Sequence, residues 1–350
     1  MGLYSIENII DKKGQRRKIV KIFGIKMSFK RAVDPDVGLL MKEMTDLKLK
    51  MDKSIAYQAQ LKFFLDTACD ITKCKPATGN VRLLQDVRAK ALKLLIPIFE
   101  KYNIEWWIDF GSLLGVYRHK GFIPWDTDVD VTCRRTDYMR LYEILKEELP
   151  KYNMTLSVGE KGRAHFMKVA DKGGLLTYLD IFPFDTCNNP ELSKKDLHKK
   201  WASVRTDFYE KYFDKLENGA ISIWDLIPEL ERMQKYAGMQ ADEGDEKWLF
   251  RGIDSATANK KPSIHLLENL YPLQKGVWEG IEVNIPNKLE EWLHECEDGI
   301  YGDLMTFPTS YSALKHQNDF KKCANGGNFI EKLKDLNKFL DELLSKSEIK

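Results

Sequence analysis

Two neighbouring stretches carry most of the structural information in this chain, Trp107-Ile108-Asp109-Phe110-Gly111-Ser112-Leu113-Leu114-Gly115 and Ile123-Pro124-Trp125-Asp126-Thr127-Asp128-Val129-Asp130-Val131. Residues 105–110 are mostly aromatic and aliphatic, which predicts a buried strand. Gly111 and Ser112 then predict a turn into a helix over residues 113–117. Backbone N–H groups at such a helix start are suited to holding a phosphate.

The second stretch places acidic residues at every other position of a predicted strand. Its period of two sends Asp128 and Asp130 to one face and Val129 and Val131 to the other. Neighbouring carboxylates repel each other, so a divalent cation is their natural partner, with Mg²⁺ (or Mn²⁺) the best match to hard oxygen ligands. Asp126 lies nearer the bend and is interpreted as a pocket residue rather than a ligand.

Two other interpretations of the acidic series were weighed. An EF-hand loop starting at Asp126 would put Val131 where glycine is needed and Asp137 where a bidentate glutamate is expected. A solvated acidic loop is the simpler alternative for an isolated D-x-D. The preceding strand, the turn and the apolar alternation favour a metal-dependent phosphoryl-transfer site instead.

A third carboxylate is expected from the apolar run over residues 176–185. Asp180 stands among apolar residues there, which predicts a partner for it, because an unpaired buried carboxylate is costly. Its predicted role is to bind a second metal or to take a proton from the acceptor. Pro183 is predicted to end this strand, which makes Asp185 a turn residue.

The motif Gly111-Ser112-Leu113-Leu114-Gly115, followed by Arg118 and by residues 122–130, resembles the signature of the LicD family. That family includes bacterial phosphocholine transferases and is similar to the fukutin-related polyol-phosphate transferases. The resemblance covers roughly residues 81–310 and is loose after the first block, with Trp278 standing where phenylalanine is expected. It implies a nucleotidyltransferase-like mixed β-sheet flanked by helices, of α/β or α+β class.

The resemblance implies an enzyme that transfers a phosphorylated alcohol, either phosphocholine or a polyol phosphate, from a CDP-activated donor to a hydroxyl of a cell-surface glycan. Two other enzyme interpretations stay open, a nucleotidyltransferase and a D-x-D glycosyltransferase of polysaccharide biosynthesis. A scaffold that binds metal and glycan without turnover is the alternative that is not an enzyme.

Within this interpretation each site residue has an expected role. Asp128, Asp130 and Asp180 form the catalytic and metal-binding set. The donor phosphates are assigned to the Gly-Ser turn, the forked side chain of Arg118 and their neighbours. Trp125 either stacks on the cytosine or is a core aromatic. The donor-binding set is Gly111, Ser112, Arg118, His119, Lys120, Trp125 and Asp126.

An acceptor side is predicted from two weaker patterns. Arg163, His165 and Lys168 stand among apolar residues on one predicted strand, although a half-solvated strand explains them more simply. Glu279 and Glu282 are assigned to the acceptor by the family resemblance alone.

Composition limits the remaining possibilities. The chain has 350 residues, 43% of them hydrophobic, and a net charge of +2, so it can bury a sizeable core and no nucleic-acid partner is expected. It has no apolar run of membrane-spanning length and opens on no signal segment, which predicts a cytoplasmic protein, or one peripheral to the inner face of the membrane. Its six cysteines and six histidines are scattered, which disfavours a zinc site or a Cys-His nucleophile.

Four segments are expected along the chain. Residues 1–36 are a basic segment whose part 12–31 either contacts an anionic membrane or forms a small strand pair around Gly24. Residues 37–75 are a helical appendage that offers a route to a homo-oligomer. Residues 76–324 form the catalytic domain, and residues 325–350 a C-terminal helix.

Overall fold

The structure, a computed structural model, describes residues 4–10, 16–22, 25–29, 35–158, 164–241, 244–256, 262–296, 301–307 and 317–347. The chain divides into two compact units, residues 1–67 and residues 68–350. Each unit is described by itself.

The first unit contains a small sheet and all but the last residue of a long helix. Strands β1 (Tyr4–Ile10), β2 (Arg16–Ile22) and β3 (Ile25–Phe29) pair in antiparallel order, and α1 spans Pro35–Ala68. The strand pair around Gly24 and the long charged helix are therefore confirmed. The expected membrane contact through residues 12–31 stays a prediction, and residues 11–15, 23–24 and 30–34 lie outside the described residues.

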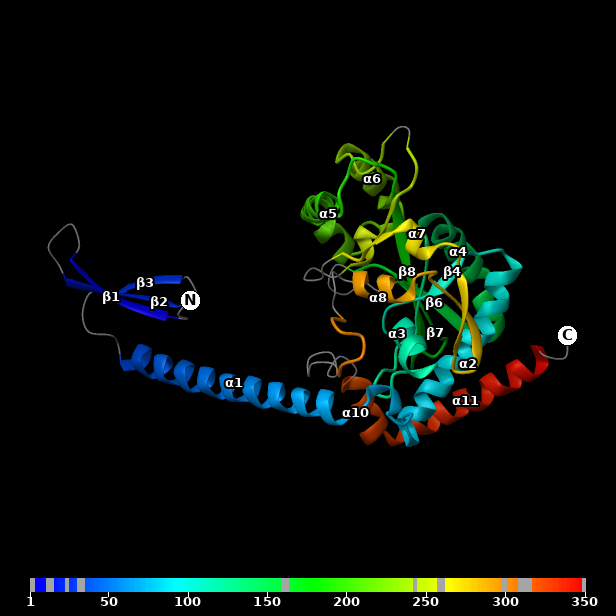
Figure 1. Ribbon diagram of the computed structural model, residues 1–350, viewed down its shortest axis with the longest axis horizontal. Helices are drawn as coiled ribbons and strands as arrows, with labels where there is room; N and C mark the ends of the chain where they lie inside the picture. The colour runs from blue at the N-terminus through cyan, green and yellow to red at the C-terminus, as the bar shows by residue number, and fades with distance from the viewer. Residues whose placement is uncertain are drawn as a thin grey trace. The chain divides into compact units, whose positions relative to one another are not determined.

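The second unit is built on a seven-stranded mixed sheet covered by helices (Figure 1). Its main path is β10 (Ile264–Leu266), β9 (Trp248–Arg251), β8 (Thr177–Cys187), β5 (Asp130–Arg134) and β4 (Trp106–Ile108). A branch joins β6 (Met154–Val158) to β7 (Met167–Asp171), and β7 to the first half of β8. Only β5 and β8 pair in parallel among these described strands. The mixed sheet flanked by helices confirms the predicted fold class.

The helices follow the apolar periodicity of the sequence. The buried side of α2 (Gly79–Lys101) includes Leu84, Ala91 and Leu95, which recur at helical spacing. The other helices of this unit are α3 (Phe110–His119), α4 (Arg135–Glu148), α5 (Lys194–Glu217), α6 (Ile223–Tyr236), α7 (Leu267–Leu270), α8 (Leu289–Glu295), α10 (Gln317–Asn325) and α11 (Gly327–Ser347). A hairpin of β11 (Gln274–Trp278) and β12 (Ile281–Ile285) and three short 3-10 helices (Ile71–Lys73, Leu149–Tyr152 and Ile253–Ser255) complete the described elements.

The C-terminal helix packs on α2 as part of the same unit (Figure 1). Leu333 and Leu340 of α11 are fully buried. Lys90 of α2 donates to Asn337 at 2.9 Å and pairs with Asp341 at 2.6 Å. The last helix therefore supports the helix that leads into the acidic motif.

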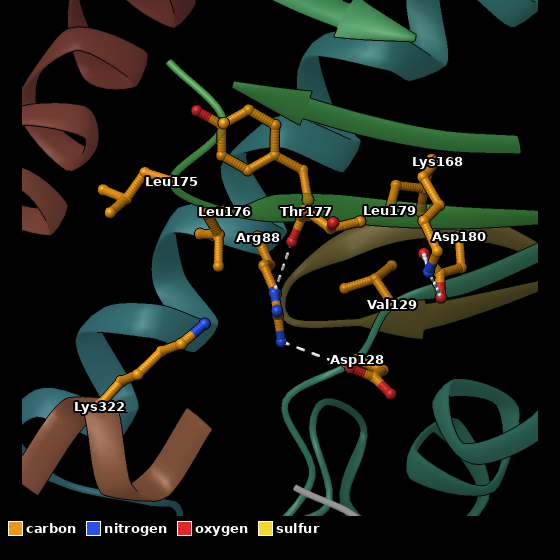
Figure 2. A pocket seen from close by; sticks show the side chains of 12 residues that line it. Arg88, Asp128, Val129, Lys168, Leu175, Leu176, Thr177, Leu179, Asp180 and Lys322 are labelled. Atoms are coloured by element: carbon orange, nitrogen blue, oxygen red, sulfur yellow. Dashed lines mark hydrogen bonds and ion pairs between the residues drawn. The ribbon is translucent and has the colours of Figure 1, made fainter. Parts of the chain in front are cut away.

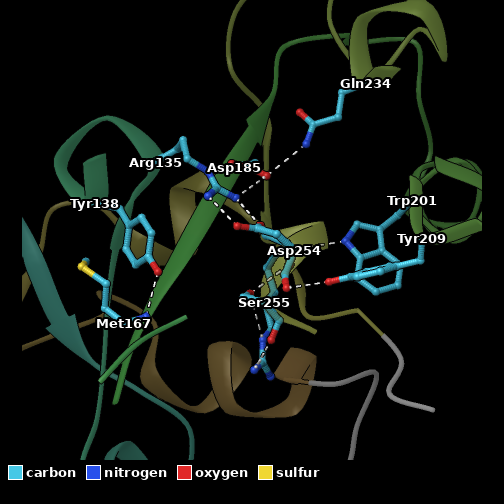
Figure 3. A network of polar contacts seen from close by, with 11 residues as sticks. Arg135, Tyr138, Met167, Asp185, Trp201, Tyr209, Gln234, Asp254 and Ser255 are labelled. Carbon is cyan, nitrogen blue, oxygen red and sulfur yellow. Dashed lines mark hydrogen bonds and ion pairs between the residues drawn. The ribbon is translucent and has the colours of Figure 1, made fainter. Parts of the chain in front are cut away.

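Strand β8 does not end at Pro183, so that prediction is wrong. Pro183 lacks only its own N–H, and its carbonyl still accepts a hydrogen bond from the Gly252 N–H at 2.9 Å while β8 continues to Cys187. Asp185 is consequently a buried strand residue and not a turn residue. Arg135 holds it at 2.6 Å and also holds Asp254 at 2.6 Å, which ties β8 to α4 and to the 3-10 helix Ile253–Ser255 (Figure 3).

Candidate active site

Three charged residues lie in one row across neighbouring strands. In the parallel pair, Asp130 of β5 is opposite Asp180 of β8. In the antiparallel pair, Lys168 of β7 is opposite the same Asp180. Side chains of directly opposed residues point to the same face of a sheet. The register therefore brings together two of the predicted carboxylates, with Lys168 beside them and Asp128 two residues before β5.

The Gly-Ser turn fixes the backbone of the acidic motif. Ser112 is buried in the first turn of α3, where its hydroxyl donates to the Asp128 carbonyl at 3.2 Å and accepts from the Asp130 N–H at 3.0 Å. Asp109 caps the same helix by accepting from the Phe110 N–H at 2.8 Å. The turn thus sets the position of both metal-ligand candidates, a role that the sequence analysis had not given it.

The absence of a side chain at position 111 leaves room for the Asp126 carboxylate. A Cβ built there would lie 2.5 Å from the Asp126 Oδ2 atom, so a larger residue would displace that carboxylate. Asp126 in turn accepts from the Asp128 N–H at 3.2 Å. Gly111 and Asp126 therefore shape the loop that presents Asp128.

Arg88 is a site residue that the sequence analysis missed. It lies on α2 with 5% of its surface exposed, and its guanidinium approaches Asp128 Oδ1 at 3.5 Å (Figure 2). The same group donates to the Thr177 carbonyl at 3.0 Å and to the Thr127 carbonyl. The sequence does contain a signal for Arg88, because this charged residue lies on the apolar stripe of its helix, four residues after Leu84.

Lys168 and Asp180 form a close ion pair at the edge of the site. The Lys168 ammonium lies 2.8 Å from Oδ1 and 2.9 Å from Oδ2 of Asp180 (Figure 2). Burial raises the pKa of Asp180, with the Asp128 charge adding to the rise, whereas the Lys168 charge opposes it. A buried carboxylate with a fixed cation fits the expectation that Asp180 has a partner.

These residues line a pocket of about 380 Å³ (Figure 2). Arg88, Asp128, Lys168, Asp180 and Lys322 supply its charged groups, and residues 174–179 supply a wall. Lys322 comes from α10, almost two hundred residues after Asp128, and no local sequence pattern pointed to it. The pocket therefore combines carboxylates with cations, as a site for phosphate esters requires.

The carboxylates suit a divalent cation by their chemistry. Hard carboxylate oxygens are the ligands that Mg²⁺ prefers. Within the described residues, however, no three His, Cys, Asp or Glu side chains converge in an arrangement that would hold a metal ion. Asp180 is directed to Lys168, so the donor set fits a cation at Asp128 and Asp130 better than one shared with Asp180.

None of the seven predicted donor-binding residues is among the described residues that line this pocket, and the three at the end of α3 lie farthest along that helix from the Gly-Ser turn. Helix α3 is ten residues long and carries Arg118 and His119 about 9–10 Å along its axis from Ser112 in the first turn. Arg118 is buried and donates to the carbonyls of Leu304 and Thr306. His119 Nε2 lies 3.1 Å from the Ile71 carbonyl, and burial lowers its pKa. Lys120 is exposed at the end of the helix.

Trp125 packs on other aromatic rings. It stacks on Phe307 with ring centres 6.0 Å apart, which favours the core interpretation.

Of the predicted acceptor side, only Lys168 lines the pocket among the described residues. The His165 ring stacks on Tyr209. Glu279 accepts from Arg82 at 2.6 Å, and Glu282 pairs with Lys275 at 3.1 Å. Arg163 lies outside the described residues.

Comparison with known proteins matches this architecture. Residues 103–226 match the profile of the LicD/FKTN/FKRP nucleotidyltransferase domain, and they include the turn, all three carboxylates and Lys168. Residues 103–226 therefore resemble the LicD family. The matched LicD domain starts just before β4 and ends in α6.

Among its relatives, the lipopolysaccharide cholinephosphotransferase LicD of Haemophilus influenzae is 31% identical over 141 residues, which are 37% of this chain and 53% of that protein. An uncharacterised protein of Rickettsia prowazekii is 42% identical over 50 residues, 14% of this chain and 19% of its own length. One from Rickettsia typhi is 40% identical over 50 residues, 14% of this chain and 16% of its own length. The chain thus spans about half the length of the first relative and less of the others.

Proposed function

We propose that this protein transfers a phosphorylated alcohol, phosphocholine or a polyol phosphate, from a CDP-activated donor to a hydroxyl of a cell-surface glycan, with Mg²⁺ or Mn²⁺ as cofactor. The observation that carries the proposal is the row of Asp130 and Asp180 beside Asp128, held by the Gly-Ser turn inside a LicD domain. The similarity to a lipopolysaccharide cholinephosphotransferase supports a glycan acceptor.

Asp128 and Asp130 are the residues that would hold the divalent cation, which supplies neutralising charge for the donor diphosphate. Ser112 fixes the backbone of both residues through its two hydrogen bonds. Arg88 and Lys322 add positive charge along the pocket that would receive the phosphates. Asp180, held by Lys168, is the candidate to take the proton of the acceptor hydroxyl.

Nucleotidyl transfer is the second candidate, because the matched domain is described as a nucleotidyltransferase domain. The two reactions break different bonds of a nucleotide substrate and release different products. From a CDP-linked alcohol, phospho-alcohol transfer releases CMP, whereas nucleotidyl transfer releases the phospho-alcohol. Nucleotidyl transfer from a nucleoside triphosphate releases pyrophosphate.

The cellular setting is proposed on weaker grounds. No helix within the described residues is long and apolar enough to cross a membrane. We propose that the enzyme works at the inner face of the membrane, with residues 12–31 in contact with anionic lipid, and that α1 offers a surface for a homo-oligomer.

The test is an assay of the intact chain with Mg²⁺, a bacterial lipooligosaccharide, and CDP-choline, CDP-ribitol or CDP-glycerol. We expect CMP release together with the mass of one phospho-alcohol on the glycan. Asp128→Asn and Asp130→Asn should each lower the rate by about 10³-fold or more, and the exposed Asp214→Asn should leave it unchanged. Near-normal rates in both site variants would exclude these residues from the mechanism. Release of the free phospho-alcohol with addition of CMP to the glycan, in place of CMP release, would favour nucleotidyl transfer.

A further inference from the structure

Lys168 is fixed beside the third carboxylate by strand register. It lies directly opposite Asp180 in the β7–β8 pair, while Asp130 lies opposite Asp180 on the other side. Directly opposed residues of an antiparallel pair have Cβ atoms about 4.5–5.5 Å apart. Because the register sets this distance, the Lys168 side chain lies within reach of the Asp180 carboxylate.

The ammonium is also held by an aromatic ring. Lys168 Nζ lies 4.4 Å from the centre of the Phe166 ring, which itself packs on Phe182 at 4.4 Å. An aromatic face and a carboxylate stabilise the same ammonium from two directions. The Lys168 side chain is 27% exposed and that of Asp180 17%, so solvent screens this pair only in part.

Two of the three cations that line the pocket, Lys168 and Arg88, engage carboxylates differently. Lys168 contacts both oxygens of Asp180, at 2.8 and 2.9 Å. Arg88 approaches Asp128 Oδ1 at 3.5 Å and directs hydrogen bonds to the carbonyls of Thr127 and Thr177. Both carboxylate oxygens of Asp180 therefore contact a fixed positive charge.

We propose that the Lys168 ammonium takes the place of a second divalent cation, so that this site binds one such ion, at Asp128 and Asp130. A metal ion placed between Asp130 and Asp180 would have to displace the Lys168 ammonium from Asp180 or lie beside it. The ion and the ammonium are both positive and repel each other in a half-buried site. The inference rests on the metal dependence in the proposed function. Lys168 is on this basis a positioning residue that keeps Asp180 free of metal.

The experiment counts bound Mn²⁺ per chain, because Mn²⁺ accepts the same oxygen ligands and its free form is measured by electron paramagnetic resonance. The intact protein is titrated with Mn²⁺ in the presence of saturating CDP, which supplies a diphosphate without a transferable alcohol. The variants are Lys168→Met, Asp180→Asn and Asp130→Asn. Lys172→Met is the matched control, since Lys172 is an exposed lysine just after the same strand.

We expect one Mn²⁺ in the native chain, in Lys172→Met and in Asp180→Asn, and a second Mn²⁺ in Lys168→Met, whose Asp180 no longer has its cation. Thermal unfolding of each variant shows that the count is taken on folded protein. Two Mn²⁺ in the native chain, loss of the single Mn²⁺ in Asp180→Asn, or an unchanged count in Lys168→Met would each overturn the inference.

The same titration separates this inference from the proposed function. A single Mn²⁺ that survives Asp130→Asn unchanged would contradict the metal ligands of the proposed function. The absence of any bound Mn²⁺ in the native chain would remove both proposals. Phospho-alcohol transfer with two bound ions would leave the proposed function intact and overturn only the role of Lys168.

Discussion

Replacing Arg88 with methionine should destabilise the protein strongly, because one buried guanidinium connects three segments of the site. Arg88 donates to the carbonyls of Thr127 and Thr177 and lies 3.5 Å from Asp128 Oδ1. Hydrogen bonds from a charged donor contribute about 1.5–3 kcal/mol each to stability. Removing one partner of a buried ion pair lowers the free energy of unfolding by about 3–5 kcal/mol. We therefore expect Arg88→Met to lower the free energy of unfolding by roughly 3–5 kcal/mol.

Urea unfolding followed by tryptophan fluorescence measures this loss directly. All eight tryptophans lie between residues 106 and 292, so the signal reports on the unit of residues 68–350. Arg88→Lys should recover part of the loss, since an ammonium can still reach one of the carbonyls. Arg140→Met is the matched control, because its side chain is 53% exposed and its ion pair is worth about 1 kcal/mol or less.

A double-mutant cycle with Asp128→Asn separates the ion pair from the carbonyl hydrogen bonds. The Asp128 side chain is 29% exposed and the contact is long, so the coupling energy should be about 1 kcal/mol or less. A loss below about 1 kcal/mol in Arg88→Met would refute the reasoning. A coupling energy that accounts for most of the loss would show that the ion pair, and not the two carbonyls, carries the stability.

Three further predictions concern other parts of the chain. Ser112→Ala leaves the buried Asp130 N–H without its acceptor and should cost about 1–3 kcal/mol in urea unfolding as well as slow transfer; an unchanged rate would contradict the role of the turn. Full burial lowers the pKa of His265, so below about pH 6.5 the unfolded chain binds more protons than the folded chain. The free energy of unfolding should therefore fall as the pH drops below about 6.5, by up to about 1.4 kcal/mol per pH unit. His265→Phe should remove this pH dependence, and an identical pH profile of stability in both proteins would contradict the role of His265. Removal of residues 1–31 should reduce sedimentation with anionic vesicles and leave turnover on a soluble acceptor unchanged; undiminished sedimentation would exclude this segment as the membrane contact.

The carboxylates of the site were predictable because their signals are local. The period of two in Asp128 and Asp130 is a property of one strand, and the small residues Gly111 and Ser112 mark a turn wherever they follow a buried strand. Asp180 stood out because a lone carboxylate in an apolar strand needs a partner. The register places Asp180 opposite Asp130, and the shared catalytic role of the two residues stays a prediction.

The cations were harder to predict because their positions depend on tertiary packing. Arg118 follows the motif closely in sequence, yet a straight helix carries it away from the turn and into contact with the carbonyls of Leu304 and Thr306. Arg88 precedes Asp128 by forty residues in the sequence. It reaches Asp128 because α2 packs against β8. Sequence proximity to a motif therefore proved a poor guide to which cation serves it.

This difference bears on the chemistry of the whole site. A D-x-D strand and a third carboxylate give the site its negative charge. The number of metal ions needed to balance that charge depends on which cationic side chains the neighbouring strands and helices place beside the carboxylates. In this chain β7 places Lys168 opposite Asp180 and α2 places Arg88 near Asp128. The same acidic motif with an uncharged residue opposite its third carboxylate would need a second cation to reach the same balance. In the proposed mechanism, the number of bound metal ions therefore depends on cross-strand register as well as on the motif itself.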